Sequence, residues 1–161
     1  MNHNPYAPPK ANVDDLVGSE SGASTVSARM YSSTQMAVAS FIGTPIAAAW
    51  FAAANFKALG QPRKATQTLL WGLVATAFVI GLALVLPDNT PNTVLPIGYS
   101  IAVRLIAERV FGTTLKDHAS AGGKLGSWWR IVGVSLLFVL ALCAVMACVI
   151  TLLVLSGAMK L

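Results

Sequence analysis

Long hydrophobic segments separated by short polar stretches dominate the chain after residue 30. They cover residues 35–56, 65–86, 94–111 and 128–156. A transmembrane helix needs about 20 consecutive apolar residues, a length that the first, second and fourth segments reach. The third segment is the weakest, because only about ten apolar residues precede Arg104, and Glu108 and Arg109 follow. The pattern predicts an all-α fold, an integral membrane helical bundle of about four transmembrane helices within residues 31–161.

Residues 1–30 differ in character from the rest of the chain. Pro and Gly stand there among Ser, Asn and Asp, and no apolar periodicity exists that could offset the entropy lost on ordering. The sequence therefore predicts a flexible N-terminal tail. The tail lacks the basic start and apolar core of a secretory signal peptide, so we expect the protein to retain it.

Small side chains are concentrated in the first hydrophobic segment. Gly43 and Ala47 form a small-xxx-small pair of the kind that lets helices approach closely, and Asn55 could cap the helix or bond across helices. Pro45 removes one backbone donor and should kink or break the helix, which leaves both a full crossing and a re-entrant segment open. The candidates for helix packing are thus Gly43, Pro45, Ala47 and Asn55.

Composition supports a membrane location. Of the 161 residues, 55% are hydrophobic and 11% charged, against roughly 25% charged in a typical soluble domain. The mean hydropathy is +0.67. The net charge of +5 does not indicate nucleic-acid binding, because most Lys and Arg residues flank hydrophobic segments and no basic face studded with aromatic residues is apparent.

The distribution of Lys and Arg predicts an orientation. Three lie between the first two segments and five around the connection of the third to the fourth, whereas residues 87–93 contain none. The positive-inside rule therefore places the basic loops 57–64 and 109–130 in the cytoplasm. Four full crossings, the arrangement we favour, put both termini outside. A re-entrant first segment would keep the tail in the cytoplasm, with ten of the eleven basic residues on that side.

Four residues are expected at the membrane interface. Trp128 and Trp129 resemble the aromatic belt at headgroup level, and Arg130 could reach lipid phosphates. If the third segment spans the bilayer, Arg104 is expected to snorkel toward its basic end or to face other helices.

Residues with catalytic potential are few and scattered. Asp117 and His118 are adjacent, but neighbours in sequence are not a catalytic pair, and no nucleophile with an orienting group stands near them. Cys143 and Cys148 point about 140° apart on a helix, so they favour apolar packing over a disulfide or a metal site. We expect no catalytic residues, no cofactor and no metal, and therefore no enzyme.

Two stretches resemble known bacterial sequences. The opening Asn4-Pro5-Tyr6-Ala7-Pro8-Pro9 resembles the leader of many small inner-membrane proteins of proteobacteria. The pattern over Tyr31 to Gly60, which includes Phe41-Ile42-Gly43, Pro45 and Asn55-Phe56, is similar to one that recurs in uncharacterised bacterial membrane proteins. The resemblance implies the bacterial inner membrane and supplies no catalytic residues.

These observations favour a non-enzymatic structural or interaction component of the membrane. The expected partners are the lipid bilayer and either a second copy, giving a homo-oligomer, or another membrane protein, and the small-residue face of the first segment is the reason. The runner-up is a small transporter or channel subunit that acts as an oligomer, because one chain offers no polar pathway. A membrane-embedded enzyme ranks last.

Overall fold

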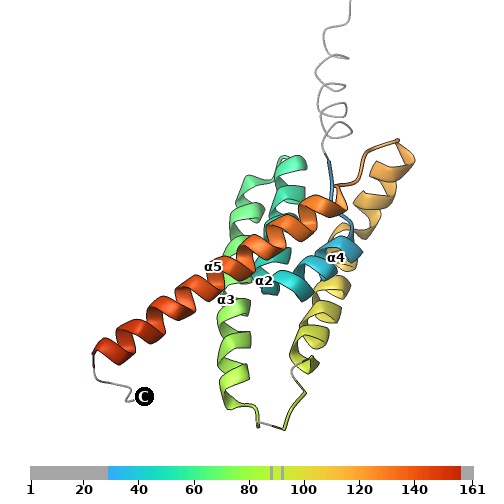
Figure 1. The fold of residues 1–161 in the computed structure, drawn as a ribbon. Helices are drawn as coiled ribbons and strands as arrows, with labels where there is room; N and C mark the ends of the chain where they lie inside the picture. Colours follow the sequence, from blue (N-terminus) through green and yellow to red (C-terminus); the bar gives the residue numbers. More distant parts are fainter. Residues whose placement is uncertain (1–28, 88, 92, 157–161) are drawn as a thin grey trace, which may run out of the picture.

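The computed structural model describes residues 29–87, 89–91 and 93–156. They form the helices α2 (Ser33–Ala58), α3 (Pro62–Val85), α4 (Val94–Ser120) and α5 (Trp128–Leu155), arranged as in Figure 1. The all-α fold is therefore confirmed. The predicted tail over residues 1–30 lies, apart from Arg29 and Met30, outside the described residues.

Within the described residues, three helices have the length and composition of membrane-crossing segments. These are α2, α3 and α5, and the chain is accordingly a multi-pass integral membrane protein. The 27-residue helix α4 is long enough, but it carries Arg104, Glu108 and Arg109 along its length. It is not among the three, which agrees with the weakness of the third segment in the sequence.

Helix α2 is broken in the middle and folds back on itself. Gly43 and Thr44 have non-helical backbone angles, and Pro45 follows them as the start of the second half. The side chain of Asn55 bonds the backbone of Tyr31, 24 residues earlier. A straight helix would separate two such residues by about 36 Å. The two halves therefore form a helical hairpin whose tip is Gly43–Thr44.

Neither half of this hairpin could cross a bilayer alone. Residues 33–42 make a helix of about 15 Å and residues 45–58 one of about 21 Å, both shorter than a hydrocarbon core of about 30 Å. α2 reaches the length of a crossing only when its halves are counted as one helix. Of the two alternatives that Pro45 left open, the geometry favours the re-entrant one.

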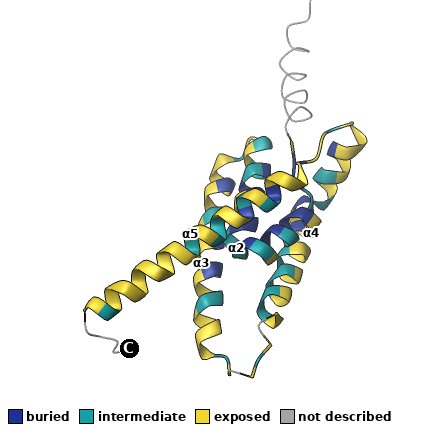
Figure 2. Ribbon diagram, viewed as in Figure 1, coloured by how far each residue is buried: buried dark blue, intermediate teal, exposed yellow. Residues whose placement is uncertain are grey.

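The hairpin is the centre of the fold. Among the described residues, the extensive contacts between helices all involve α2, which packs against α3, α4 and α5. The buried residues accordingly gather on and around α2 in Figure 2. Phe51 is fully buried and packs against Tyr31 with ring centroids 4.7 Å apart, and Phe56 packs against Phe111 of α4 with centroids 4.8 Å apart; both ring pairs are tilted.

Hydrogen bonds bring three connecting segments to one end of the molecule. The Gly126 N–H donates to the Met30 carbonyl oxygen at 2.9 Å, and Gln35 Nε2 donates to the Gly126 carbonyl oxygen at 2.7 Å. The start of α2 thus adjoins the α4–α5 loop, and through Asn55 it adjoins the α2–α3 turn. The α3–α4 turn lies at the opposite end (Figure 1). We call the end that contains the start of α2, the α2–α3 turn and the α4–α5 loop the basic end. Its loops contain or adjoin four basic residues, Lys57, Arg63, Lys64 and Lys124.

Helix α4 continues beyond its expected end. The sequence predicted that the third segment ends at residue 111 and that a basic loop covers 109–130, but α4 extends to Ser120, so that prediction is wrong for residues 112–120. Leu115 packs against the core and His118 is buried. With Phe111 they repeat at helical spacing, so tertiary packing favours the helix over the polar local composition.

Helix α5 leaves the bundle after crossing α2. Its residues Ile131 and Ser135 are fully buried, whereas most side chains beyond them are exposed. Figure 2 shows this distal part as a mostly exposed helix that extends away from the others. Its apolar surface is therefore available to lipid or to a partner.

Candidate functional site

The tip of the hairpin meets α5 at backbone contact. A Cβ atom on Gly43 would come within 2.8 Å of the Ser135 carbonyl oxygen and within 2.8 Å of the Ala47 Cβ. Real Cβ atoms do not approach other atoms so closely, so this crossing requires glycine. The small residues of the first segment thus bring α2 and α5 of the same chain together.

A hydroxyl from α3 caps the second half of the hairpin. The Ile46 N–H lies in the first turn after Pro45 and has no carbonyl partner within that half, and it donates to Thr76 Oγ1 at 3.0 Å. Thr76 Oγ1 in turn donates to the Gly72 carbonyl oxygen at 2.8 Å. Thr76 therefore acts as an N-cap for the second half of α2, although it belongs to a neighbouring helix. This bond holds the hairpin tip beside the middle of α3.

Three further hydroxyls at the break are buried without a hydrogen bond. Ser40 Oγ and Thr44 Oγ1 of α2 and Ser135 Oγ of α5 find no partner within the described part of the chain. Ser40 lies one turn before Gly43, and Gly43 contacts Ser135. Thr44 is also the only described residue other than glycine with a positive φ, 70°. Such strain costs about 1–3 kcal/mol and tends to mark functional positions.

The four predicted helix-packing residues all lie within the chain's own contacts. Gly43 meets Ser135, Pro45 begins the second half of the hairpin, Ala47 is fully buried, and Asn55 is fully buried against Tyr31. At the start of α5, Trp128, Trp129 and Arg130 are exposed beside the basic end. Their role as interface anchors stays a prediction.

Arg104 and Glu108 form an ion pair on α4. Arg104 Nε donates to Glu108 Oε1 at 2.9 Å, and the two side chains are 56% and 47% exposed. Seven residues later on α4, Phe111 packs against Phe56 near the basic end, so Arg104 lies about 10 Å of helix further from that end. If α3 crosses the bilayer, Arg104 therefore lies deeper than the interface position expected from the sequence.

The other candidates for chemistry are not brought together. His118 is buried with its ring against Gly123, and its Nε2 has no partner among the described residues, while Asp117 is exposed. Cys143 and Cys148 are free and exposed. Within the described residues, no three His, Cys, Asp or Glu side chains form a group that could hold a metal.

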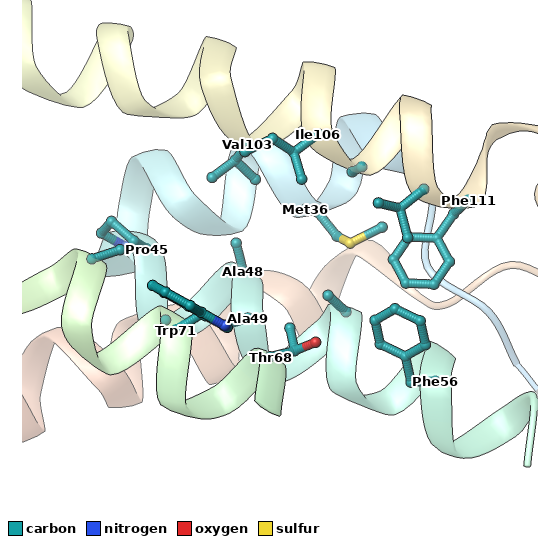
Figure 3. A pocket seen from close by; sticks show the side chains of 15 residues that line it. Met36, Pro45, Ala48, Ala49, Phe56, Thr68, Trp71, Val103, Ile106 and Phe111 are labelled. Carbon is teal, nitrogen blue, oxygen red and sulfur yellow. The ribbon is translucent and has the colours of Figure 1, made fainter. Parts of the chain in front are cut away.

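Sequence reasoning missed a cavity between α2, α3 and α4. Its volume is about 560 Å³, within the range of ligand pockets. Figure 3 shows it from close by, with Pro45, Ala49 and Phe56 from α2, Trp71 from α3, and Val103 and Phe111 from α4. No local signal in the sequence could have revealed it, because it exists only where the hairpin meets two other helices.

Comparison of the chain with protein-family models, with curated proteins and with solved structures finds no match.

Proposed function

We propose that the chain is a non-enzymatic component of the bacterial inner membrane that works by binding a membrane partner along α4, either a second copy or another membrane protein. The observation that carries the proposal is the half-exposed ion pair of Arg104 and Glu108. The small-residue face of the first segment no longer supports it, because Gly43 and Ala47 pack within the chain itself.

The depth of the ion pair is the reason to expect a partner. Charged side chains within the hydrocarbon region are costly and almost always face protein or water. Arg104 and Glu108 neutralise one another, yet about half of each side chain faces away from its own chain. A protein surface with matching polar groups would shield this face from lipid. The exposed residues Ile101 and Leu105 beside the pair would then lie in the same interface.

Photo-crosslinking in intact cells tests this proposal. A photoreactive side chain at Ile101, which is 55% exposed on α4, should give a discrete crosslinked product. The matched control is Leu70, which is 59% exposed on α3, and it should give none. A product of twice the mass identifies a second copy, and another mass identifies a different membrane protein. Crosslinking to lipid alone at Ile101 would contradict the proposal.

The same proposal includes an orientation. The start of α2 lies at the basic end, so Arg29 is on the side of Lys57, Arg63, Lys64 and Lys124. The positive-inside rule then places the N-terminal side of α2 in the cytoplasm and the α3–α4 turn outside. This is the re-entrant arrangement rather than the four crossings that we favoured from the sequence.

A transporter subunit is the second candidate, favoured by the break in α2. Many transporters bind substrates and ions at discontinuous helices near the bilayer midplane, where half-helix ends leave backbone groups free. Here Ser40, Thr44 and Ser135 add buried hydroxyls that have no hydrogen-bond partner among the described residues. Hydroxyl and carbonyl oxygens suit an alkali cation. Sodium should therefore raise the melting temperature of the protein relative to choline at equal ionic strength. The variant Ser135→Ala should abolish this difference. Equal melting temperatures in both salts would contradict this candidate.

A further inference from the structure

We propose that the cavity between α2, α3 and α4 holds one acyl chain of an anionic phospholipid, whose headgroup lies against Lys64 at the basic end. The site does not depend on a partner at α4, because the cavity lies on the side of that helix that faces α2. Three independent properties of the cavity carry this inference: its chemistry, its length and the charge at one end.

The lining of the cavity suits a hydrocarbon chain. Nearly all of its residues are aliphatic or aromatic. The exception with a hydroxyl is Thr68, whose Oγ1 already donates to the Lys64 carbonyl oxygen at 2.8 Å. A polar ligand would lose its hydrogen bonds to water here without replacement, whereas an apolar chain loses nothing. The volume of about 560 Å³ is large enough for a ligand of this size class.

The length of the cavity matches one leaflet. It runs along the second half of α2, from Pro45 at the hairpin tip to Phe56 near the basic end (Figure 3). Eleven residues of helix span about 16 Å. The hydrocarbon core of a bilayer is about 30 Å thick, so the cavity reaches from one surface to about the midplane. An acyl chain of the leaflet at the basic end covers this distance.

A lysine lies where the headgroup of such a lipid would be. Lys64 Nζ is 6.0 Å from the centroid of the Phe56 ring, and Phe56 lines the cavity. Lys64 is also one turn before Thr68 on α3. Lys57 and Arg63 belong to the same basic turn. The phosphate of an anionic lipid would therefore meet positive charge while its chain occupies the apolar space below.

Quenching of Trp71 by brominated lipids tests the site, because Trp71 lines the cavity. The other three tryptophans, Trp50, Trp128 and Trp129, are replaced by Phe, and the protein is placed in vesicles that are mostly phosphatidylcholine. A small, equal fraction of brominated phosphatidylglycerol or brominated phosphatidylcholine is then added. We expect several-fold stronger quenching by phosphatidylglycerol. Equal quenching by both lipids would overturn the proposal.

Two pairs of variants separate the site from general contact with lipid. Lys64→Gln should reduce quenching by phosphatidylglycerol to the level of phosphatidylcholine, and Lys116→Gln, on an exposed residue of α4, should not. Ala75→Leu fills the cavity and should remove the same excess, whereas Ala77→Leu on the exposed side of α3 should leave it intact. An excess that survives both Lys64→Gln and Ala75→Leu would refute the site.

Native mass spectrometry of the chain with all four tryptophans provides a second readout, independent of the Phe substitutions. One phosphatidylglycerol should stay bound to the unaltered protein, and Lys64→Gln should need a several-fold higher lipid concentration to reach the same occupancy. Identical lipid retention by the two proteins would overturn the assignment of the headgroup to Lys64.

Discussion

Asn55 holds the two ends of the α2 hairpin together through the backbone of Tyr31. Its Nδ2 donates to the Tyr31 carbonyl oxygen and its Oδ1 accepts from the Tyr31 N–H, both at 2.8 Å. The asparagine side chain has both an N–H donor and a carbonyl acceptor, so it can pair with the N–H and the carbonyl of one residue at the same time. The pairing explains why a polar residue is fully buried near the end of an apolar segment.

Removal of this pairing should destabilise the fold. Asn55→Leu leaves the buried N–H and carbonyl of Tyr31 unpaired, at a cost of about 1–3 kcal/mol for each group. Thermal unfolding in detergent should show a clearly lower melting temperature. Asn55→Asp would place a buried carboxylate against the Tyr31 carbonyl oxygen at neutral pH, so it should destabilise the protein at least as much as Asn55→Leu. Gln67→Leu on the exposed side of α3 is the control. Wild-type stability of Asn55→Leu would contradict the hairpin closure.

A methyl group at the hairpin tip should disrupt the crossing of α2 with α5. Gly43→Ala places a Cβ within 2.8 Å of the Ser135 carbonyl oxygen, where the backbone must shift. We expect a loss of about 1–3 kcal/mol in unfolding free energy. Gly81→Ala enters open space and should be neutral or slightly stabilising, as alanine favours helix. Equal stabilities of the two variants would show that the crossing is looser than described.

The cap from α3 provides a third test. Thr76→Val keeps the shape of the side chain but removes the acceptor of the Ile46 N–H, so it should cost about 0.5–2 kcal/mol, as the loss of an N-cap does. Thr76→Ser retains the hydroxyl and should recover most of the stability. Unfolding by increasing denaturing detergent would measure both. If Thr76→Ser loses stability and Thr76→Val does not, the methyl group rather than the hydroxyl stabilises the tip.

Cysteine accessibility distinguishes the two membrane arrangements. With Cys143 and Cys148 replaced by Ser, single cysteines are placed at Ser19 and Asn89 and labelled in intact cells with an impermeant maleimide. The re-entrant hairpin predicts that Asn89 labels and Ser19 reacts only after lysis, because the start of α2 lies at the basic end. Equal labelling of both positions in intact cells would restore the arrangement with four full crossings.

Hydrophobic runs and a single proline revealed much of this fold. Apolar length located the helices to within a few residues, except at the end of α4, and Pro45 marked the break. What remained open was how far the chain turns at the break. That turn depends on the bond of Asn55 to Tyr31 and on Gly126 beside Gln35, contacts between residues up to 91 positions apart. Local sequence periodicity does not predict such long-range contacts.

The candidate sites were less predictable than the helices. The sequence pointed to Gly43 and Ala47 as a small-residue face, but composition cannot tell whether such a face meets another helix of its own chain or a partner. The depth of Arg104 depended on where α4 ends, and buried residues such as His118, rather than local propensity, determine that end. The cavity required three helices in their final positions.

The central position of α2 has a consequence for biosynthesis. The ribosome makes α2 before α3, α4 and α5, yet each of those helices packs chiefly against it. In every newly made chain, the alanine-rich faces of the hairpin and the Asn55 amide therefore lack their covering helices until those later helices have inserted. Neither half of the hairpin is long enough to span the bilayer by itself during this interval. Truncation after α3 should accordingly yield a species that remains bound to insertion factors or chaperones, and release should begin only once α5 has left the ribosome.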